Sequence, residues 1–466
     1  MSTIPDTQTT TEAPSGLTPA RTRRALLGLG IPVYFELLSG VVAGIIDTVW
    51  VSRLGEAAVG AVAVASTLEN VLLGVILMAN IGATVLIADA MGGGRRAELP
   101  TIMRAVGVLW LIITPIVAFG GFLARDQVAT LLVGGETEVH RLAVDFFTIA
   151  FPGMAVFFAQ NVVDGIFKGT GDTKTPMRMA ILANSCILVL DPLLIYGVGA
   201  LPHMGVQGAA LGMLIGRSVA LCVSLALLWR KRLGDVGDAP SVTLRWPTAL
   251  RRLLNIGLPA SGDFVLRMGI SATLVGIVAR FGEDPLAAYG IGVKVILFVT
   301  MAFYALRQAS SILTARTRGA GENADKVIGQ QSVLLAMAVG AGAGLALALG
   351  GRLVMGIFTD ASTVVDSGAT LLWYLLPYLV LLAGVVGLGG AFMGGGRTRA
   401  MFWVTLMGAV VQLPLAYGLS SLPALDVQGV WLSMIIGTGA QYLMSYVLFQ
   451  RYFGARAGRA AADSRS

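Results

Sequence analysis

Charged side chains are scarce in this sequence. Of its 466 residues only 13% are Asp, Glu, Lys or Arg, whereas 56% are hydrophobic. A soluble globular protein has about 25% charged residues, because its surface must be covered by groups that interact with water. The low charge therefore excludes a soluble fold and indicates a chain that crosses a membrane several times.

Histidine and cysteine are also nearly absent. The two histidines, His140 and His203, lie in predicted loops, and the two cysteines, Cys186 and Cys222, lie inside hydrophobic runs. Two cysteines cannot form a disulfide framework or a four-cysteine metal site. Two histidines leave little room for zinc binding or acid–base catalysis. We therefore expect no enzyme, no metal and no cofactor.

Two further absences narrow the class. No Gly-Lys dipeptide occurs, so the chain lacks the phosphate-binding loop of an ATPase. The net charge is +7, but the basic residues fall in short loops between hydrophobic runs, which argues against nucleic-acid binding. If the chain moves molecules, an ion gradient is the energy source that remains.

What the sequence does contain is a series of twelve hydrophobic runs. Each is long enough to cross a bilayer as a helix and too continuous for the strands of a barrel. We predict an all-α polytopic membrane protein of twelve transmembrane helices. The predicted spans are 26–50, 59–88, 101–123, 143–166, 178–199, 207–229, 253–279, 286–314, 327–350, 369–392, 400–419 and 429–450.

The basic residues predict the orientation. Twenty-four Lys and Arg residues lie in, or within four residues of, the N-terminal arm, the even-numbered loops and the C-terminal tail, whereas five lie in the odd-numbered loops. The positive-inside rule then places both termini in the cytoplasm, and we expect the cytoplasmic membrane of a bacterium. The expected parts are a disordered cytoplasmic arm (1–24), an N-lobe (25–230), a cytoplasmic linker (231–252), a C-lobe (253–452) and a cytoplasmic tail (453–466).

The two halves of the chain resemble each other. The segment LLGLGIP at 26–32 aligns with LLNIGLP at 253–259, an offset of 227 residues, and RLGE at 53–56 meets RFGE at 280–283 at the same offset. Further along, YG at 196–197 meets YG at 417–418. Because each half has six spans, both halves enter the membrane from the same side. We predict two parallel six-helix repeats with a transport path between them.

Several motifs resemble those of multidrug and toxic compound extrusion (MATE) transporters. They are Pro32 followed by IDTVWVSRLG at 46–55, FKGTGDTKTP at 167–176, DPLLI at 191–195 and a weaker second copy, GGGRT, at 394–398. The resemblance covers roughly residues 25–450 and implies a two-lobed transporter driven by an ion gradient. Helix ten has no acid, and helix seven has Asp263 but no Glu. The chain therefore looks more like the DinF-like branch, whose coupling acids lie in the N-lobe.

The acids inside the predicted spans are the candidates for ion coupling. A charge at the bilayer centre costs about 2.5–3.5 kcal/mol on insertion scales. Asp47 and Asp191 lie in the outer half of the N-lobe, where two acids in one poorly hydrated pocket favour proton binding; the alternative is that they pair with Arg217 or cap broken helices. Asn161 and Asp164 share a helix face. The resemblance gives them a role with the helix-five acids, and a solvated cluster at the inner end is the alternative.

The resemblance also bears on the coupling ion. Sodium-binding relatives have an Asn four residues before the helix-five Asp and a Thr on helix six. Here position 187 is Ile, the nearest Asn is Asn184, and helix six contains no Thr. We therefore expect protons as the coupling ion, with sodium as the alternative.

Other polar residues are candidates for a substrate cleft. Glu36, Glu69 and Asn70 lie near mid-membrane, where they would attract a cationic substrate or pair with C-lobe cations across the cleft. Lys294 and Arg307 have no acid nearby in the sequence, so they either reach N-lobe acids or attract anions. Tyr34 is expected either to line the pocket as an aromatic side chain or to contact lipid. Asp263 and Arg267 are four residues apart on helix seven, and we expect them to form an ion pair.

These observations favour one function and leave one alternative. We expect a monomeric secondary antiporter in the lipid bilayer that exports amphipathic, mostly cationic small molecules in exchange for protons. The alternative is a flippase for an anionic lipid-linked intermediate that uses Arg267, Lys294 and Arg307.

Overall fold

The structure is a computed structural model that describes residues 18–135, 137–197, 202–231 and 244–454. These residues form thirteen α-helices and three short 3₁₀ or π turns. The helices are α1 (Pro19–Ser52), α2 (Glu56–Gly92), α3 (Leu99–Leu123), α4 (Arg125–Val133), α5 (Glu138–Gly169), α6 (Lys174–Tyr196), α7 (Val206–Arg230), α8 (Trp246–Val278), α9 (Glu283–Gly319), α10 (Asp325–Gly356), α11 (Ser362–Gly394), α12 (Thr398–Ser420) and α13 (Gln428–Phe449).

Twelve of these helices are long and apolar enough to cross a membrane, as the sequence predicts. The helical form follows from the solvent, because a backbone in lipid must satisfy its hydrogen bonds within its own segment. The exception is α4, a nine-residue helix that the sequence analysis missed because it is too short to span.

Two predicted boundaries are wrong. Helix α1 begins at Pro19, capped by the Thr18 side chain, so residues 19–24 are helical rather than part of an arm. Helix α8 begins at Trp246, so the last part of the predicted 231–252 linker is also helical. The rest of the predicted arm, most of the linker and most of the C-terminal tail lie outside the described residues.

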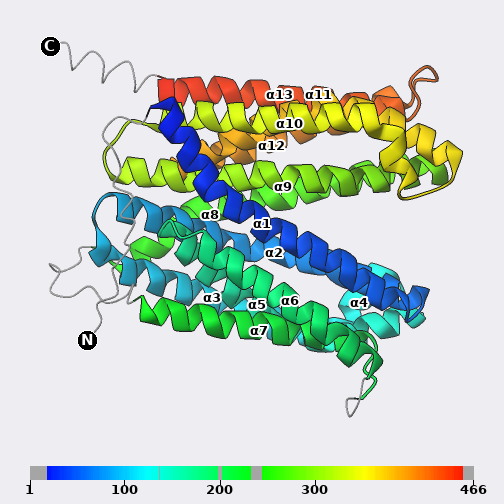
Figure 1. Ribbon diagram of the computed structural model, residues 1–466, viewed down its shortest axis with the longest axis horizontal. Coiled ribbons are helices and arrows are strands. Elements are labelled where there is room, and N and C mark those ends of the chain that lie inside the picture. Colours follow the sequence, from blue (N-terminus) through cyan, green and yellow to red (C-terminus); the bar gives the residue numbers. More distant parts are fainter. Residues whose placement is uncertain (1–17, 136, 198–201, 232–243, 455–466) are drawn as a thin grey trace, which may run out of the picture.

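The spans gather into two lobes (Figure 1). Helices α2, α3, α5, α6 and α7 form the N-lobe, and α9 to α13 form the C-lobe. The first helix of each half links the lobes. The start of α1 packs on α9 and α10, where Leu26 contacts Ala309 and Ile328, and its end packs on α6. In the same way the start of α8 packs on α2 and α3, and its end packs on α12.

The repeat seen in the sequence is present in the structure. The turns before α2 and α9 use Gly55 and Gly282, at φ 109° and 103°, and the turns after these helices use Gly94 and Gly321, at φ 67° and 79°. In each pair the two residues are 227 positions apart. Only glycine adopts such left-handed conformations without steric cost, so both halves keep it there.

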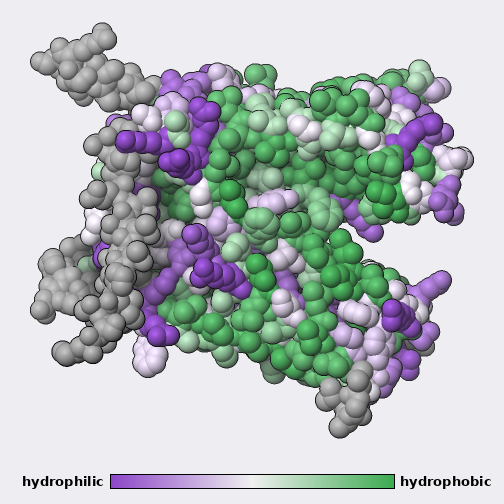
Figure 2. All heavy atoms as spheres, viewed as in Figure 1, coloured by the Kyte–Doolittle hydropathy of each residue, from purple (hydrophilic) through white to green (hydrophobic). Residues whose placement is uncertain are grey.

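The lobes meet at the side where α1 begins and α13 ends, which we call the terminal side (Figure 1). Val85 and Ala88 of α2 are buried there against Ile256 of α8 and against Ile312 and Ala315 of α9. Figure 2 shows that the surface is hollowed between the lobes at the opposite side, which we call the open side. The same view shows a broad hydrophobic band between the two polar ends. The molecule is therefore closed at the terminal side and open at the other.

Candidate functional site

Asp47 of α1 and Asp191 of α6 lie side by side in the N-lobe. Both are buried, with 5% and 0% of their surface exposed, and their carboxyl groups are within hydrogen-bonding reach of each other. Among the described residues no donor reaches Asp47 Oδ1 or either oxygen of Asp191. Two carboxyl groups can hydrogen-bond only if one carries a proton. The sequence analysis expected these two acids to come together, and the structure brings them together.

A glycine makes this packing feasible. A Cβ atom at Gly212 of α7 would overlap Asp191 Oδ1. The backbone of α7 therefore lies directly against the carboxyl group and keeps other side chains away from it. A buried carboxyl without a donor is costly, so its retention points to a functional role rather than to stability.

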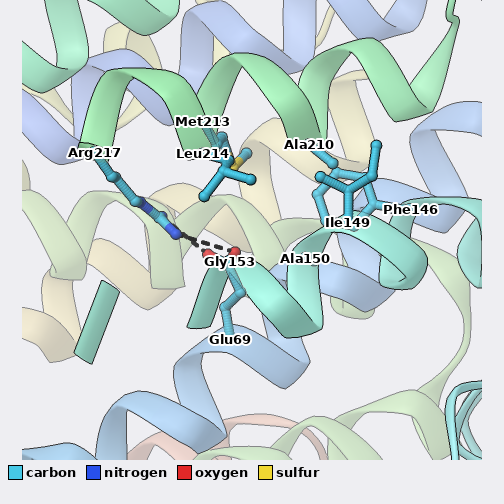
Figure 3. Close-up of a pocket in the computed structure, with 9 residues that line it drawn as sticks. All are labelled: Glu69, Phe146, Ile149, Ala150, Gly153, Ala210, Met213, Leu214 and Arg217. Atoms are coloured by element: carbon cyan, nitrogen blue, oxygen red, sulfur yellow. Dashed lines mark hydrogen bonds and ion pairs between the residues drawn. The ribbon is translucent and has the colours of Figure 1, made fainter. Parts of the chain in front are cut away.

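Glu69 of α2 and Arg217 of α7 form an ion pair (Figure 3), and both act electrostatically on Asp47. The Arg217 Nη atoms lie 3.1 and 3.3 Å from the two Glu69 carboxylate oxygens, and the guanidinium stacks 4.5 Å from the centre of the Phe157 ring. The interpretation in which Asp47 and Asp191 pair with Arg217 is therefore wrong. The expectation that Glu69 reaches C-lobe cations is wrong too, because its partner is in its own lobe.

The Glu69–Arg217 pair borders a small cavity between α2, α5 and α7 (Figure 3). Its volume, about 10 Å³, corresponds to roughly one water molecule. Hydrophobic side chains form most of its wall: Phe146, Ile149, Ala150, Ala210, Met213 and Leu214. The cavity can hydrate this charged cluster but is too small for a drug-sized ligand.

A second polar group occupies the N-lobe nearer the terminal side. Glu36 Oε1 lies 2.7 Å from Lys168 Nζ, and Asp164 lies beside both and accepts a hydrogen bond of 2.8 Å from Gln160. Glu36 was expected to attract substrate or to pair with C-lobe cations. The pairing with C-lobe cations is wrong, because Lys168 of the N-lobe is the partner of Glu36, and the role in attracting substrate stays a prediction. Lys168 itself, placed in a loop by the sequence analysis, is buried at the end of α5.

Besides Asp164, two other predicted coupling residues do not join the aspartate pair. Asn184 donates to Ser39 Oγ at 2.9 Å, about two turns along α6 from Asp191, and Asn161 donates to Phe157 O of its own helix. Of the predicted cleft residues, Asn70 is exposed and bonded to Ser66 O of its own helix, and Tyr34 is half-buried against Phe35.

The C-lobe holds its own charged cluster around Asp263. Arg267 Nε and Arg307 Nη2 lie 3.3 and 3.2 Å from the Asp263 carboxylate, and Thr405 Oγ1 donates to it at 2.5 Å. The predicted Asp263–Arg267 pair is confirmed. The expectation that Arg307 reaches N-lobe acids is wrong, because α9 places it beside Asp263. The alternative, that it attracts anions, stays a prediction. Lys294 is exposed and has no ion pair within the described part of the chain.

The protein has twelve spans in two repeated lobes, is open on one side and holds a charged cluster in each lobe. These features define a membrane transporter whose path lies between the two lobes. A family model, MatE, matches residues 32–193 and 259–418, more than half of the chain. The chain therefore belongs to the MatE family of multidrug and toxic compound extrusion transporters. The two matched stretches begin at Pro32 and Pro259, 227 residues apart, as the internal repeat requires.

Known relatives cover most of the chain. It is 24% identical over 424 residues to a probable multidrug resistance protein NorM of Thermotoga maritima, covering 89% of each chain. It is 28% identical over 488 residues to a probable NorM of Deinococcus radiodurans, covering 97% of this chain and 100% of the relative. An outward-facing multidrug resistance MATE family transporter has the same fold, with a TM-score of 0.84 at 21% identity, covering 93% of this chain and 96% of that one.

Proposed function

We propose that this protein is a proton-coupled antiporter of the cell membrane that exports amphipathic, mostly cationic compounds. The observation that carries the proposal is the Asp47–Asp191 pair, whose buried carboxyl groups have only each other as partners in the part of the chain that the structure describes. A site of this kind gains most from binding one proton, because a proton removes one of two adjacent negative charges.

The open side is assigned to the outside of the cell. The positive-inside rule supports this, since the basic loops lie at the terminal side, which would face the cytoplasm. In the open-side conformation a proton from outside would bind the aspartate pair, weaken its attraction for a cationic substrate and release that substrate outward. Rocking of the lobes would then expose the pair to the cytoplasm. Each proton that enters supplies about 2.3 kcal/mol per 100 mV of membrane potential.

Protons are favoured over sodium by the surroundings of the pair. A sodium ion would need several oxygen ligands, but Asn184 is bonded to Ser39 instead and Ile187 stands where sodium-binding relatives have Asn. We further propose that a monomer suffices, because both walls of the cleft come from one chain. The assignment to the DinF-like branch stays a prediction.

The test is efflux of a cationic dye from proteoliposomes. A pH gradient in sodium-free buffer should drive efflux by the wild type, and Asp47→Asn should abolish it, because an amide cannot exchange a proton. Asp366→Asn is the matched control, since that acid is 61% exposed and lies far from the pair. Efflux driven by sodium alone, or efflux that Asp47→Asn leaves intact, would contradict the proposal.

A further inference from the structure

The C-lobe cluster carries an uncompensated positive charge. Asp263 is 1% exposed and is the one acid that faces the guanidinium groups of Arg267 and Arg307 within the described residues. Their other polar neighbours are neutral: Thr405, Met393 and, near Arg267, the hydroxyl groups of Tyr304 and Tyr378. A full positive charge inside a membrane protein is costly unless an anion approaches it during function.

Each guanidinium group has an N–H donor group without an acceptor among the described residues. Arg267 uses Nε for Asp263 and Nη2 for Thr405, and Arg307 uses Nε for Met393 and Nη2 for Asp263. The Nη1 group of each has no hydrogen-bond partner among the described residues, and neither Nη1 is sealed in the protein interior. Each Nη1 therefore borders a space that a water molecule or a ligand can reach. Two guanidinium groups with free donors match the geometry of an oxyanion.

The cluster lies at the depth of the N-lobe acids. Ser261 of α8 donates to Gly74 O of α2 where the two lobes touch in mid-membrane. Arg267 is six residues further along α8, about 9 Å towards the open side. Glu69 is five residues from Gly74 in the same direction, about 7.5 Å. Both charged clusters therefore lie at the same level, just beyond the contact between the lobes.

The two clusters have opposite charge. In the N-lobe Asp47, Asp191 and Glu69 outnumber Arg217, and one bound proton leaves a net charge of −1. The C-lobe cluster is +1. We propose that Arg267 and Arg307 form a subsite for an oxyanion group of the transported compound, so that the preferred substrates are amphipathic zwitterions whose cationic group faces the N-lobe acids. This inference rests on the proposed export function and names the substrate class.

A pair of dyes that differ only in the anionic group tests the proposal. Rhodamine B carries a carboxylate and is a zwitterion, whereas its ethyl ester is a plain cation of nearly the same shape. Binding of each dye to the purified protein is measured by fluorescence anisotropy, and efflux is measured in proteoliposomes. Arg307→Met should weaken binding of the free acid about tenfold, the loss of one charge-assisted hydrogen bond, and change binding of the ester less than twofold.

Three further variants separate charge from folding. Asp263→Asn raises the charge of the cluster to +2 and should tighten binding of the free acid. Arg307→Lys should retain most of the wild-type affinity for the free acid. If Arg307→Met fails to fold, Arg267→Met repeats the test. Arg352→Met is the matched control, because Arg352 is 77% exposed and pairs with Asp366. Equal losses for acid and ester, or no loss for either, would overturn the subsite. If the wild type binds both dyes but a pH gradient moves neither, the export proposal fails instead.

Discussion

At the scale of single residues, nearly every charge inside the membrane finds its partner within its own lobe. Glu36 pairs with Lys168, Glu69 with Arg217 and Asp263 with two arginines. Charges that are satisfied within one lobe do not hold the lobes together, so the lobes can separate without breaking these pairs. The aspartate pair stands apart because no basic side chain among the described residues bonds to it.

Asp172, in the turn between α5 and α6, allows a prediction at this scale. Its carboxylate accepts hydrogen bonds from Thr175 N at 3.0 Å and Thr175 Oγ1 at 2.6 Å, and Lys231 Nζ lies 2.5 Å away. Burial raises the pKa of this carboxyl, but Lys231 and Thr175 outweigh burial and hold its pKa below the usual value. Asp172→Ala should lower the free energy of unfolding by about 1–2 kcal/mol at neutral pH.

The pH dependence checks the cause. A lowered folded-state pKa gives stability that is complete above the unfolded pKa, about 3.9, and is lost as the pH falls through the folded value. The difference between wild type and Asp172→Ala, measured by denaturant unfolding in detergent, should therefore be constant from pH 7 to 5 and shrink at lower pH. Asp366→Ala, at an exposed ion pair, should change stability by less than about 1 kcal/mol. A difference that grows with acid would refute this account.

At the scale of helices, α1 and α8 are equivalent by the repeat but differ in how closely they pack. A Cβ atom at Gly257 of α8 would collide with the carbonyl of Met78, whereas one at Gly30 of α1 would lie 3.7 Å from Ala305 O, an ordinary contact. Both pairs obey the 227-residue offset. The start of α8 is thus in closer backbone contact with the opposite lobe than the start of α1 is.

This difference predicts opposite effects of one substitution at equivalent positions. Gly257→Ala should lower the free energy of unfolding by about 1–3 kcal/mol, because the backbone of Met78 must move. Gly30→Ala should be neutral or stabilising by up to about 1 kcal/mol, since alanine favours a helix and has room there. Thermal unfolding of both variants in detergent decides the matter, and equal midpoints would show that the contact at Met78 does not matter.

At the scale of the whole molecule, the closed side is built from reciprocal contacts. A Cβ at Gly92 would collide with the carbonyl of Arg316, and one at Gly319 would collide with the carbonyl of Asp89. Gly92 and Gly319 are 227 residues apart, and so are Asp89 and Arg316. The two contacts are therefore related by the internal symmetry, as in an isologous dimer. An ion pair, Asp89–Arg318 at 3.9 Å, spans the lobes beside them.

Gly92→Leu should therefore favour opening at the terminal side. The readout is labelling of a cysteine at Ala315, which is fully buried between the lobes, in a chain whose own cysteines are replaced by serine. A membrane-impermeant maleimide added at the terminal side should react several-fold faster when Gly92 is leucine. Gly107→Leu is the control, because a Cβ there meets no other atom. Equal labelling of the two leucine variants would show that Gly92 is not part of the closure.

The sequence predicts features that can be read along one chain, but it does not predict contacts that depend on how two helices pack. The twelve spans and the repeat follow from composition and a fixed offset, both readable along one chain. The Asp47–Asp191 pair was reachable because both acids lie at one depth on helices of one lobe. The Lys168–Glu36 and Arg307–Asp263 pairs were missed, because they depend on how the helices rotate against each other, which no sequence pattern gives. Short α4 has no span-length signal at all.

The crossing of α1 from one lobe to the other has a consequence for biogenesis. Leu26 is fully buried against Ala309, Ala324 and Ile328, which the ribosome adds about 280 residues later. At roughly 5–20 residues per second, the start of α1 must wait on the order of 14–56 s for its partners. During that time the N-terminal half is an incomplete unit, because the start of its first helix lacks its packing partners. The insertion machinery or the lipid must cover the start of α1 until α9 and α10 are synthesised.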